Sequence, residues 1–139
     1  MKNASSHLAI LKKPYIELIL AGRKTIESRF MVRPVAPMGK LAAGDTLYLK
    51  ASAGAVAGIA KVSSFKEFRD LNFADIQKLK RDYNKFIMGT DEFWSSLTQK
   101  KCAVLVWLTD VRRIEPVRIQ KKDWRAWVVL TREKNFGLL

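Results

Sequence analysis

The stretch that decides the fold is GRKTIESRF, residues 22–30. It places four charged side chains in a segment whose apolar residues, Ile26 and Phe30, are typical of a buried strand. A period of two puts Ile26, Ser28 and Phe30 on one face and Glu27 and Arg29 on the other. We therefore predict a strand with one face in the core. Its charged face either lines a cleft or fixes the strand edge through a Glu27–Arg29 ion pair.

A short helix is predicted just before this strand, over residues 14–21. Pro14 suits a first helical turn, where its missing N–H costs nothing. Ile16, Ile19 and Leu20 recur at helical spacing and form one apolar face. Gly22 then stands where a helix end favours a left-handed residue. The apolar segment HLAIL, residues 7–11, is predicted to be a strand that precedes the helix.

Further short β-segments follow a loop that contains prolines and glycines. They are DTLYLKAS (45–52), AGAVAGIAKVSSF (53–65), CAVLVWLTDVRRI (102–114) and WVVL (127–130). Residues 68–98 instead show helical spacing of apolar side chains. We predict a single domain over residues 1–139 of the α+β class: a small mixed β-barrel of five to six strands with peripheral helices.

The charge of the chain is the strongest compositional signal. Twenty-six Lys and Arg against thirteen Asp and Glu give a formal net charge of +13. Such an excess attracts polyanions, so RNA or a nucleotide-like ligand is the leading partner class, with a solubilising surface as the alternative. No apolar run approaches the ~20 residues of a membrane span, and the single Cys102 fits a reducing compartment. We expect a cytoplasmic protein with no membrane partner.

The scarcity of certain residue types narrows the chemistry. One histidine and one cysteine exclude the usual Cys/His zinc clusters, and no glycine-rich phosphate-binding motif occurs. A histidine-activated thiol would have to pair His7 with Cys102. We therefore predict no metal and no cofactor, and chemistry that depends on Lys, Thr, Ser, Tyr and Glu.

The segment LAGRKTIESRF, preceded by the KKPYIELI helix, resembles the GxKxxExR signature of the ASCH (activating signal cointegrator homology) family. Gly22, Lys24, Glu27 and Arg29 occupy the signature positions. The strands that follow also look like those of the family, so the resemblance covers most of the chain and leaves 68–98 as a variable helical insert. It implies a PUA-like, partly open β-barrel with a cleft that binds RNA or modified nucleotides.

The resemblance leaves open whether the protein is an enzyme. Some small bacterial members are amidohydrolases of N4-acetylcytidine that use a Lys, a Thr nucleophile and a Glu. Their Lys corresponds to Lys24, and the position of their Thr falls on Glu27. Other members have been suggested to be ribonucleases. The alternative function is therefore a metal-independent hydrolase of an N-acylated nucleoside or of single-stranded RNA, with Lys24 and Glu27 catalytic. A third is a protein-interaction module with an acidic partner.

The predicted ligand contacts centre on the signature. Lys24, at the glycine turn, is expected to swing over the cleft mouth as a phosphate contact. Arg29 suits a phosphate or a base edge, and Glu27 suits an exocyclic amine such as cytosine N4. Two further groups of residues, on the next strand and in an aromatic and basic segment, are predicted to extend the ligand surface. They are Tyr48, Lys50 and Ser52, and Lys121, Lys122, Trp124 and Arg125.

Overall fold

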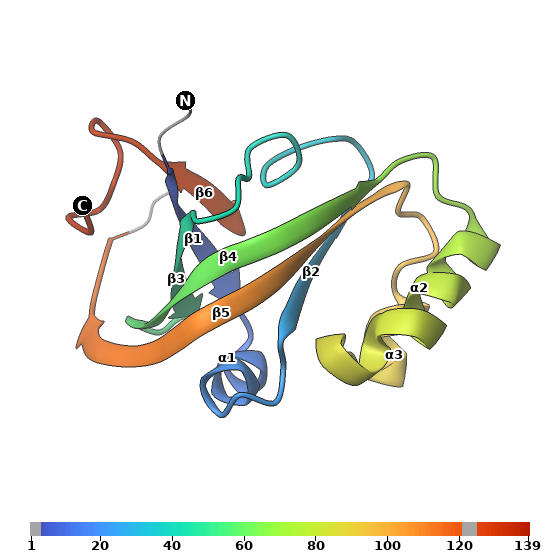
Figure 1. Ribbon diagram of the computed structural model, residues 1–139, viewed down its shortest axis with the longest axis horizontal. Helices are drawn as coiled ribbons and strands as arrows, with labels where there is room; N and C mark the ends of the chain where they lie inside the picture. The colour runs from blue at the N-terminus through green and yellow to red at the C-terminus, as the bar shows by residue number, and fades with distance from the viewer. Residues whose placement is uncertain (1–3, 121–124) are drawn as a thin grey trace.

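The computed structural model of the protein describes residues 4–120 and 125–139 (Figure 1). Within them the chain forms six strands and three helices. The strands are β1 (Ser6–Leu11), β2 (Ile26–Met31), β3 (Thr46–Ala51), β4 (Val56–Phe68), β5 (Cys102–Val117) and β6 (Trp127–Leu130). The helices are α1 (Lys13–Leu20), α2 (Phe73–Ile87) and α3 (Asp91–Ser95). This confirms the predicted α+β class.

The strands form one curled sheet in the order β2-β5-β4-β3-β1-β6, which makes a half-barrel with β2 and β6 at its two edges. Only β1 and β3 run parallel; the other neighbouring strands are antiparallel. The long β4–β5 ribbon crosses the molecule and carries register shifts at three places between Val56 and Ser64. Such bulges bend a strand, which explains how a 16-residue β5 can follow the curl.

Helix α1 lies across one end of the half-barrel (Figure 1). Pro14 occupies its first turn, Ile16 and Ile19 are buried, and Gly22 follows with φ of +77°. The helix approaches the sheet closely at Gly58, where an added Cβ would lie 3.0 Å from Leu20 Cδ2. A larger residue at this point of β4 would press against Leu20 of the helix.

Apolar side chains cover both faces of β2 and β5. Met31 of β2 and Val104 of β5 belong to the core enclosed by the curled sheet. Ile26 and Leu105 pack on the other face against apolar residues of α2 and α3, including the buried Trp94. Strand β2 thus has apolar packing on both faces, which the sequence pattern predicted for one face only.

The helical insert begins later than predicted. Residues up to Phe68 still belong to β4, because they pair with the first residues of β5. Helix α2 then starts after Asn72, which forms a capping box with Asp75. No helix among the described residues is long and apolar enough to cross a membrane.

Candidate functional site

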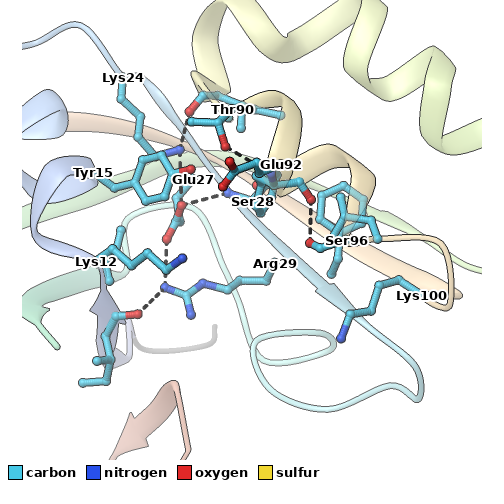
Figure 2. Close-up of a pocket in the computed structure, with 17 residues that line it drawn as sticks. Lys12, Tyr15, Lys24, Glu27, Ser28, Arg29, Thr90, Glu92, Ser96 and Lys100 are labelled. Carbon is cyan, nitrogen blue, oxygen red and sulfur yellow. Dashed lines mark hydrogen bonds and ion pairs between the residues drawn. The ribbon is translucent and has the colours of Figure 1, made fainter.

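A pocket of about 540 Å³ opens beside the charged half of β2 (Figure 2). Residues 27–30 of β2 form its floor, and residues 10–12 with Tyr15 form one wall. The opposite wall comes from the end of α2, from α3 and from the segment that leads to Lys100. A pocket of this volume is within the range that binds small ligands.

Lys24 is buried rather than exposed at the mouth of the cleft, with only 3% of its surface accessible. Its Nζ donates hydrogen bonds to the carbonyl oxygens of Ile87 (2.6 Å) and Ile26 (2.9 Å) and lies 3.4 Å from Glu27 Oε1. Ile87 is the last residue of α2, where carbonyl groups lack helical partners and a cation is favourable. Lys24 therefore joins the helical insert to β2. A direct phosphate contact, as predicted, would require it to leave these acceptors.

The buried charges alter the ionisation of Lys24 and Glu27. Burial lowers the pKa of the Lys24 ammonium more than the neighbouring Glu27 raises it. Burial would raise the pKa of Glu27, but the charges of Arg29 and Lys24, with hydrogen bonds from Arg29 and the Ser28 N–H, lower it below its usual value. Glu27 is thus held as a carboxylate between two cationic side chains.

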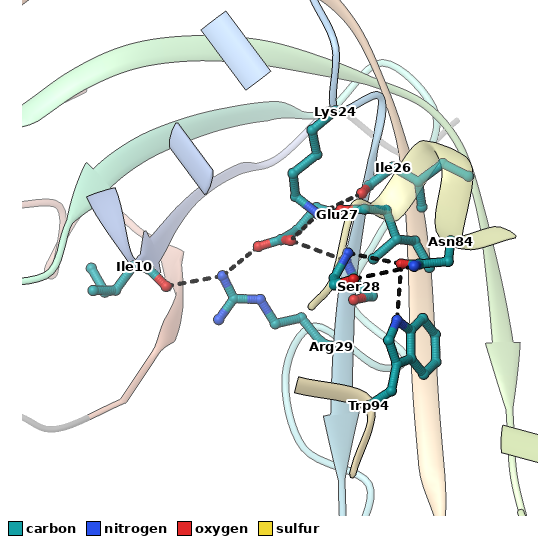
Figure 3. Close-up of polar contacts among 10 residues, drawn as sticks. Ile10, Lys24, Ile26, Glu27, Ser28, Arg29, Asn84 and Trp94 are labelled. Carbon is teal, nitrogen blue, oxygen red and sulfur yellow. Dashed lines mark hydrogen bonds and ion pairs between the residues drawn. The ribbon is translucent and has the colours of Figure 1, made fainter. Parts of the chain in front are cut away.

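Arg29 crosses the opening between the two edges of the half-barrel (Figure 3). Its Nη2 donates to Glu27 Oε2 (2.8 Å) and to the carbonyl oxygen of Ile10 on β1 (3.0 Å). Its Nη1 donates to the carbonyl oxygen of Ala126, next to β6, at 3.3 Å. The Glu27–Arg29 pair, one of the two predicted alternatives, is therefore present. The buried Nε has no hydrogen-bond partner within the described part of the chain.

The ring of Trp127 contacts the Arg29 guanidinium group and is itself held by a buried chain of hydrogen bonds. The guanidinium carbon lies 5.3 Å from the ring centre of Trp127, in cation–π contact. The indole Nε1 donates to His7 Nδ1 (3.1 Å), so the ring hydrogen is on His7 Nε2, which donates to Asp45 Oδ2 at 2.8 Å. Burial would raise the pKa of Asp45, but this bond and two main-chain N–H groups lower it. Both nitrogens of His7 are occupied, so it cannot activate Cys102 as it stands.

The wall formed by the insert was not recognised from the sequence. Asn84 holds Gly89 by two hydrogen bonds, one in each direction, and also accepts one from Trp94 Nε1. An added Cβ on Gly89 would lie 2.5 Å from a ring carbon of Phe93, so only glycine fits there. This arrangement brings Lys100 and the hydroxyl side chains of the insert to the pocket. In the sequence, the only sign of this wall is the pair Gly89 and Thr90 after a helical segment.

The other predicted contacts lie elsewhere. Tyr48, Lys50 and Ser52 do not line the pocket; the Tyr48 hydroxyl donates to the Leu138 carbonyl under the C-terminal segment. Arg125 is exposed and also lies outside the pocket lining. Their binding roles stay predictions. The predicted residues Lys121, Lys122 and Trp124 fall outside the described residues. No group of residues suited to hold a metal ion occurs in residues 4–120 and 125–139.

Comparisons with known proteins place the chain by family and fold. The family model of the ASCH domain matches residues 10–136. No curated protein matches the sequence. The crystal structure of ASCH from Zymomonas mobilis superposes with a TM-score of 0.74 at 16% identity, covering 95% of this chain and 92% of that one. A mutant of the same Zymomonas mobilis protein gives 0.73 at 16%, with 94% and 93% covered. At these identities the likeness establishes the fold alone.

Proposed function

Because the chain belongs to the ASCH domain family, we propose that it binds RNA or a nucleotide in the pocket beside Lys24, Glu27 and Arg29. The observation that carries the proposal is the set of cationic side chains at the pocket, whose lining includes Arg29, Lys12 and Lys100. The guanidinium group of an arginine presents a planar row of donors that suits phosphate oxygens and the edge of a base.

Two lysines at the pocket favour a phosphorylated ligand. Lys12 and Lys100 approach it from opposite sides (Figure 2). Neither ammonium group has a hydrogen-bond or ion-pair partner in the part of the chain that the structure describes. Free ammonium groups beside a cavity attract anions, and the net charge of +13 adds a long-range attraction. In this proposal they contact phosphate, the role predicted for Lys24.

The sequence offers a matched control for each lysine. Lys13 and Lys101 are the exposed neighbours of Lys12 and Lys100, and neither lines the pocket. The experiment measures the affinity of each Lys→Ala variant for a labelled single-stranded RNA of about ten nucleotides by fluorescence anisotropy, over a range of salt concentrations. Losing one phosphate contact should reduce the slope of log affinity against log salt by about 0.7. We expect this for Lys12→Ala and Lys100→Ala only.

Equal effects of all four substitutions would contradict binding in the pocket. They would show that RNA is attracted by the overall charge without a defined place. Absence of any binding by the wild-type protein, both to RNA and to nucleoside monophosphates, would refute the proposed function as a whole.

One observation favours a hydrolase as the second candidate. A lysine whose pKa is lowered by burial, beside a carboxylate, is an arrangement suited to proton transfer, and Lys24 and Glu27 have it. The test is turnover of N4-acetylcytidine and of single-stranded RNA, followed by chromatography. A catalytic Glu27 predicts that Glu27→Gln loses turnover while affinity is retained. A wild-type protein that binds without converting either substrate leaves binding as the function.

A further inference from the structure

Strand β2 has one edge without a partner strand among residues 4–120 and 125–139, and its hydrogen bonds show which main-chain groups point there. Within these residues β2 pairs with β5 alone. Leu108 N–H donates to the Thr25 carbonyl (3.0 Å), and these two residues continue the register in which Ile26 lies opposite Trp107. In an antiparallel pair, alternate residues bond to the neighbour and those between them point away. The main-chain groups of Ile26, Ser28 and Phe30 therefore point to the free edge.

Side chains of the signature already occupy the first part of this edge. Lys24 Nζ donates to the Ile26 carbonyl at 2.9 Å, and the Ser28 N–H donates to Glu27 Oε1 at 3.1 Å. Both contacts use main-chain groups of Ile26 and Ser28, the residues whose groups point to the free edge. The next groups along the edge are the Ser28 carbonyl, the Phe30 N–H and the Phe30 carbonyl, and none of them has a partner among the described residues. Ser28 and Phe30 both line the floor of the pocket.

We propose that the Ser28 carbonyl and the Phe30 N–H bind the pairing edge of a nucleobase, an inference that rests on the proposed nucleotide function. The pairing edge of every base carries a hydrogen-bond donor beside an acceptor. A carbonyl and the N–H two residues later lie next to each other along a strand edge, so they can accept from the donor and donate to the acceptor. Main-chain groups that face a pocket take their hydrogen-bond partners from water or from a ligand.

This mode of binding determines the class of ligand. A base inside a duplex uses its pairing edge for its complement, and a strand edge at the bottom of a pocket is out of reach of a duplex. The ligand must therefore present an unpaired base, as in single-stranded RNA or a free nucleotide. Phosphate would lie toward Lys12 and Lys100, and the base would lie on β2.

The length of the open edge argues against a peptide. Strand addition uses a row of main-chain bonds along an extended segment. Here Lys24 already occupies the Ile26 carbonyl, and Glu27 occupies the Ser28 N–H. The open part of the edge therefore extends only from the Ser28 carbonyl to the Phe30 carbonyl. Walls from Tyr15 on one side and Phe93 on the other limit the site further. One planar group fits this description better than a strand.

The experiment compares Phe30→Pro with Phe30→Ala. Both variants lose the ring, but only proline also loses the N–H. Since that N–H points away from β5, proline is tolerated at this edge and the two variants should have similar melting temperatures. Affinity for the four nucleoside 5′-monophosphates is measured by calorimetry. For the monophosphate that wild type binds most tightly, Phe30→Pro should bind roughly three- to tenfold more weakly than Phe30→Ala, the effect of one hydrogen bond.

A second measurement does not depend on the proline variant. The wild-type protein is titrated with one labelled RNA strand, alone and annealed to its complement. Stronger binding of the single strand supports the inference, and equal binding overturns it. Equal affinity of the Ala and Pro variants overturns it while leaving the proposed function intact. Binding of an extended acidic peptide with no binding of any nucleotide overturns both in favour of strand addition.

Discussion

Replacing Lys24 by alanine should strongly destabilise the fold, although lysines are usually dispensable for folding. The side chain is 3% exposed and its ammonium lies among three acceptors: two carbonyl oxygens and Glu27. Alanine leaves the carbonyls of Ile26 and Ile87 without that donor and removes one of the two cations beside a buried carboxylate. Breaking a buried pair by removing one partner costs about 3–5 kcal/mol. We expect a loss in this range.

The assay is urea unfolding at neutral pH followed by circular dichroism, with linear extrapolation to water. Arg23→Ala is the matched control, because Arg23 is the exposed neighbour and should change stability by less than about 0.5 kcal/mol. Hydrogen exchange adds a local measure: the last turn of α2 should lose protection in Lys24→Ala. A loss below about 1 kcal/mol, or unchanged exchange in α2, would refute the reasoning that Lys24 joins the insert to the sheet.

Two further predictions concern stability. Glu27 and Asp45 have pKa values lowered by folding, so their contribution is complete above the unfolded-state values of 4.5 and 3.8 and is lost as pH falls through the folded-state values. The free energy of unfolding, measured from pH 7 to pH 3, should fall below about pH 4.5, and less steeply in Asp45→Asn; a flat profile would contradict this. Gly58→Ala should lower the free energy of unfolding by roughly 1–3 kcal/mol, because the new methyl group meets Leu20 at 3.0 Å; unchanged thermal unfolding would show that α1 moves away freely.

The local elements were predictable from the sequence because local signals determine them. The helix after Pro14 and the strand WVVL are found within one or two residues of the predicted positions. Alternation also placed Glu27 and Arg29 on one face, where they form an ion pair. The family resemblance was confirmed over residues 10–136.

The surroundings of Lys24 were not predictable, for a physical reason. One of its acceptors, the carbonyl of Ile87, is 63 positions away in the sequence, and no periodic pattern shows which helix end will face a given turn. The same applies to the pocket wall. The insert was expected to lie at the periphery, yet Asn84 and Gly89 fix the segment that encloses the site. Charge at position 24 suggested exposure because lysine is rarely buried without partners, and the partner with the shortest hydrogen bond, the Ile87 carbonyl, comes from a distant segment.

The position of β1 in the sheet has a consequence for how the chain folds during synthesis. β1 lies between β3 and β6, with Ser6–Ala9 opposite Trp127–Leu130. One neighbour of this early strand is therefore absent until residues 127–130 have left the ribosome. Contacts between such distant parts of a sequence slow folding, because the chain must close a long loop before they form. Until then one edge of β1 carries unpaired main-chain groups, the kind of edge through which incompletely folded chains associate.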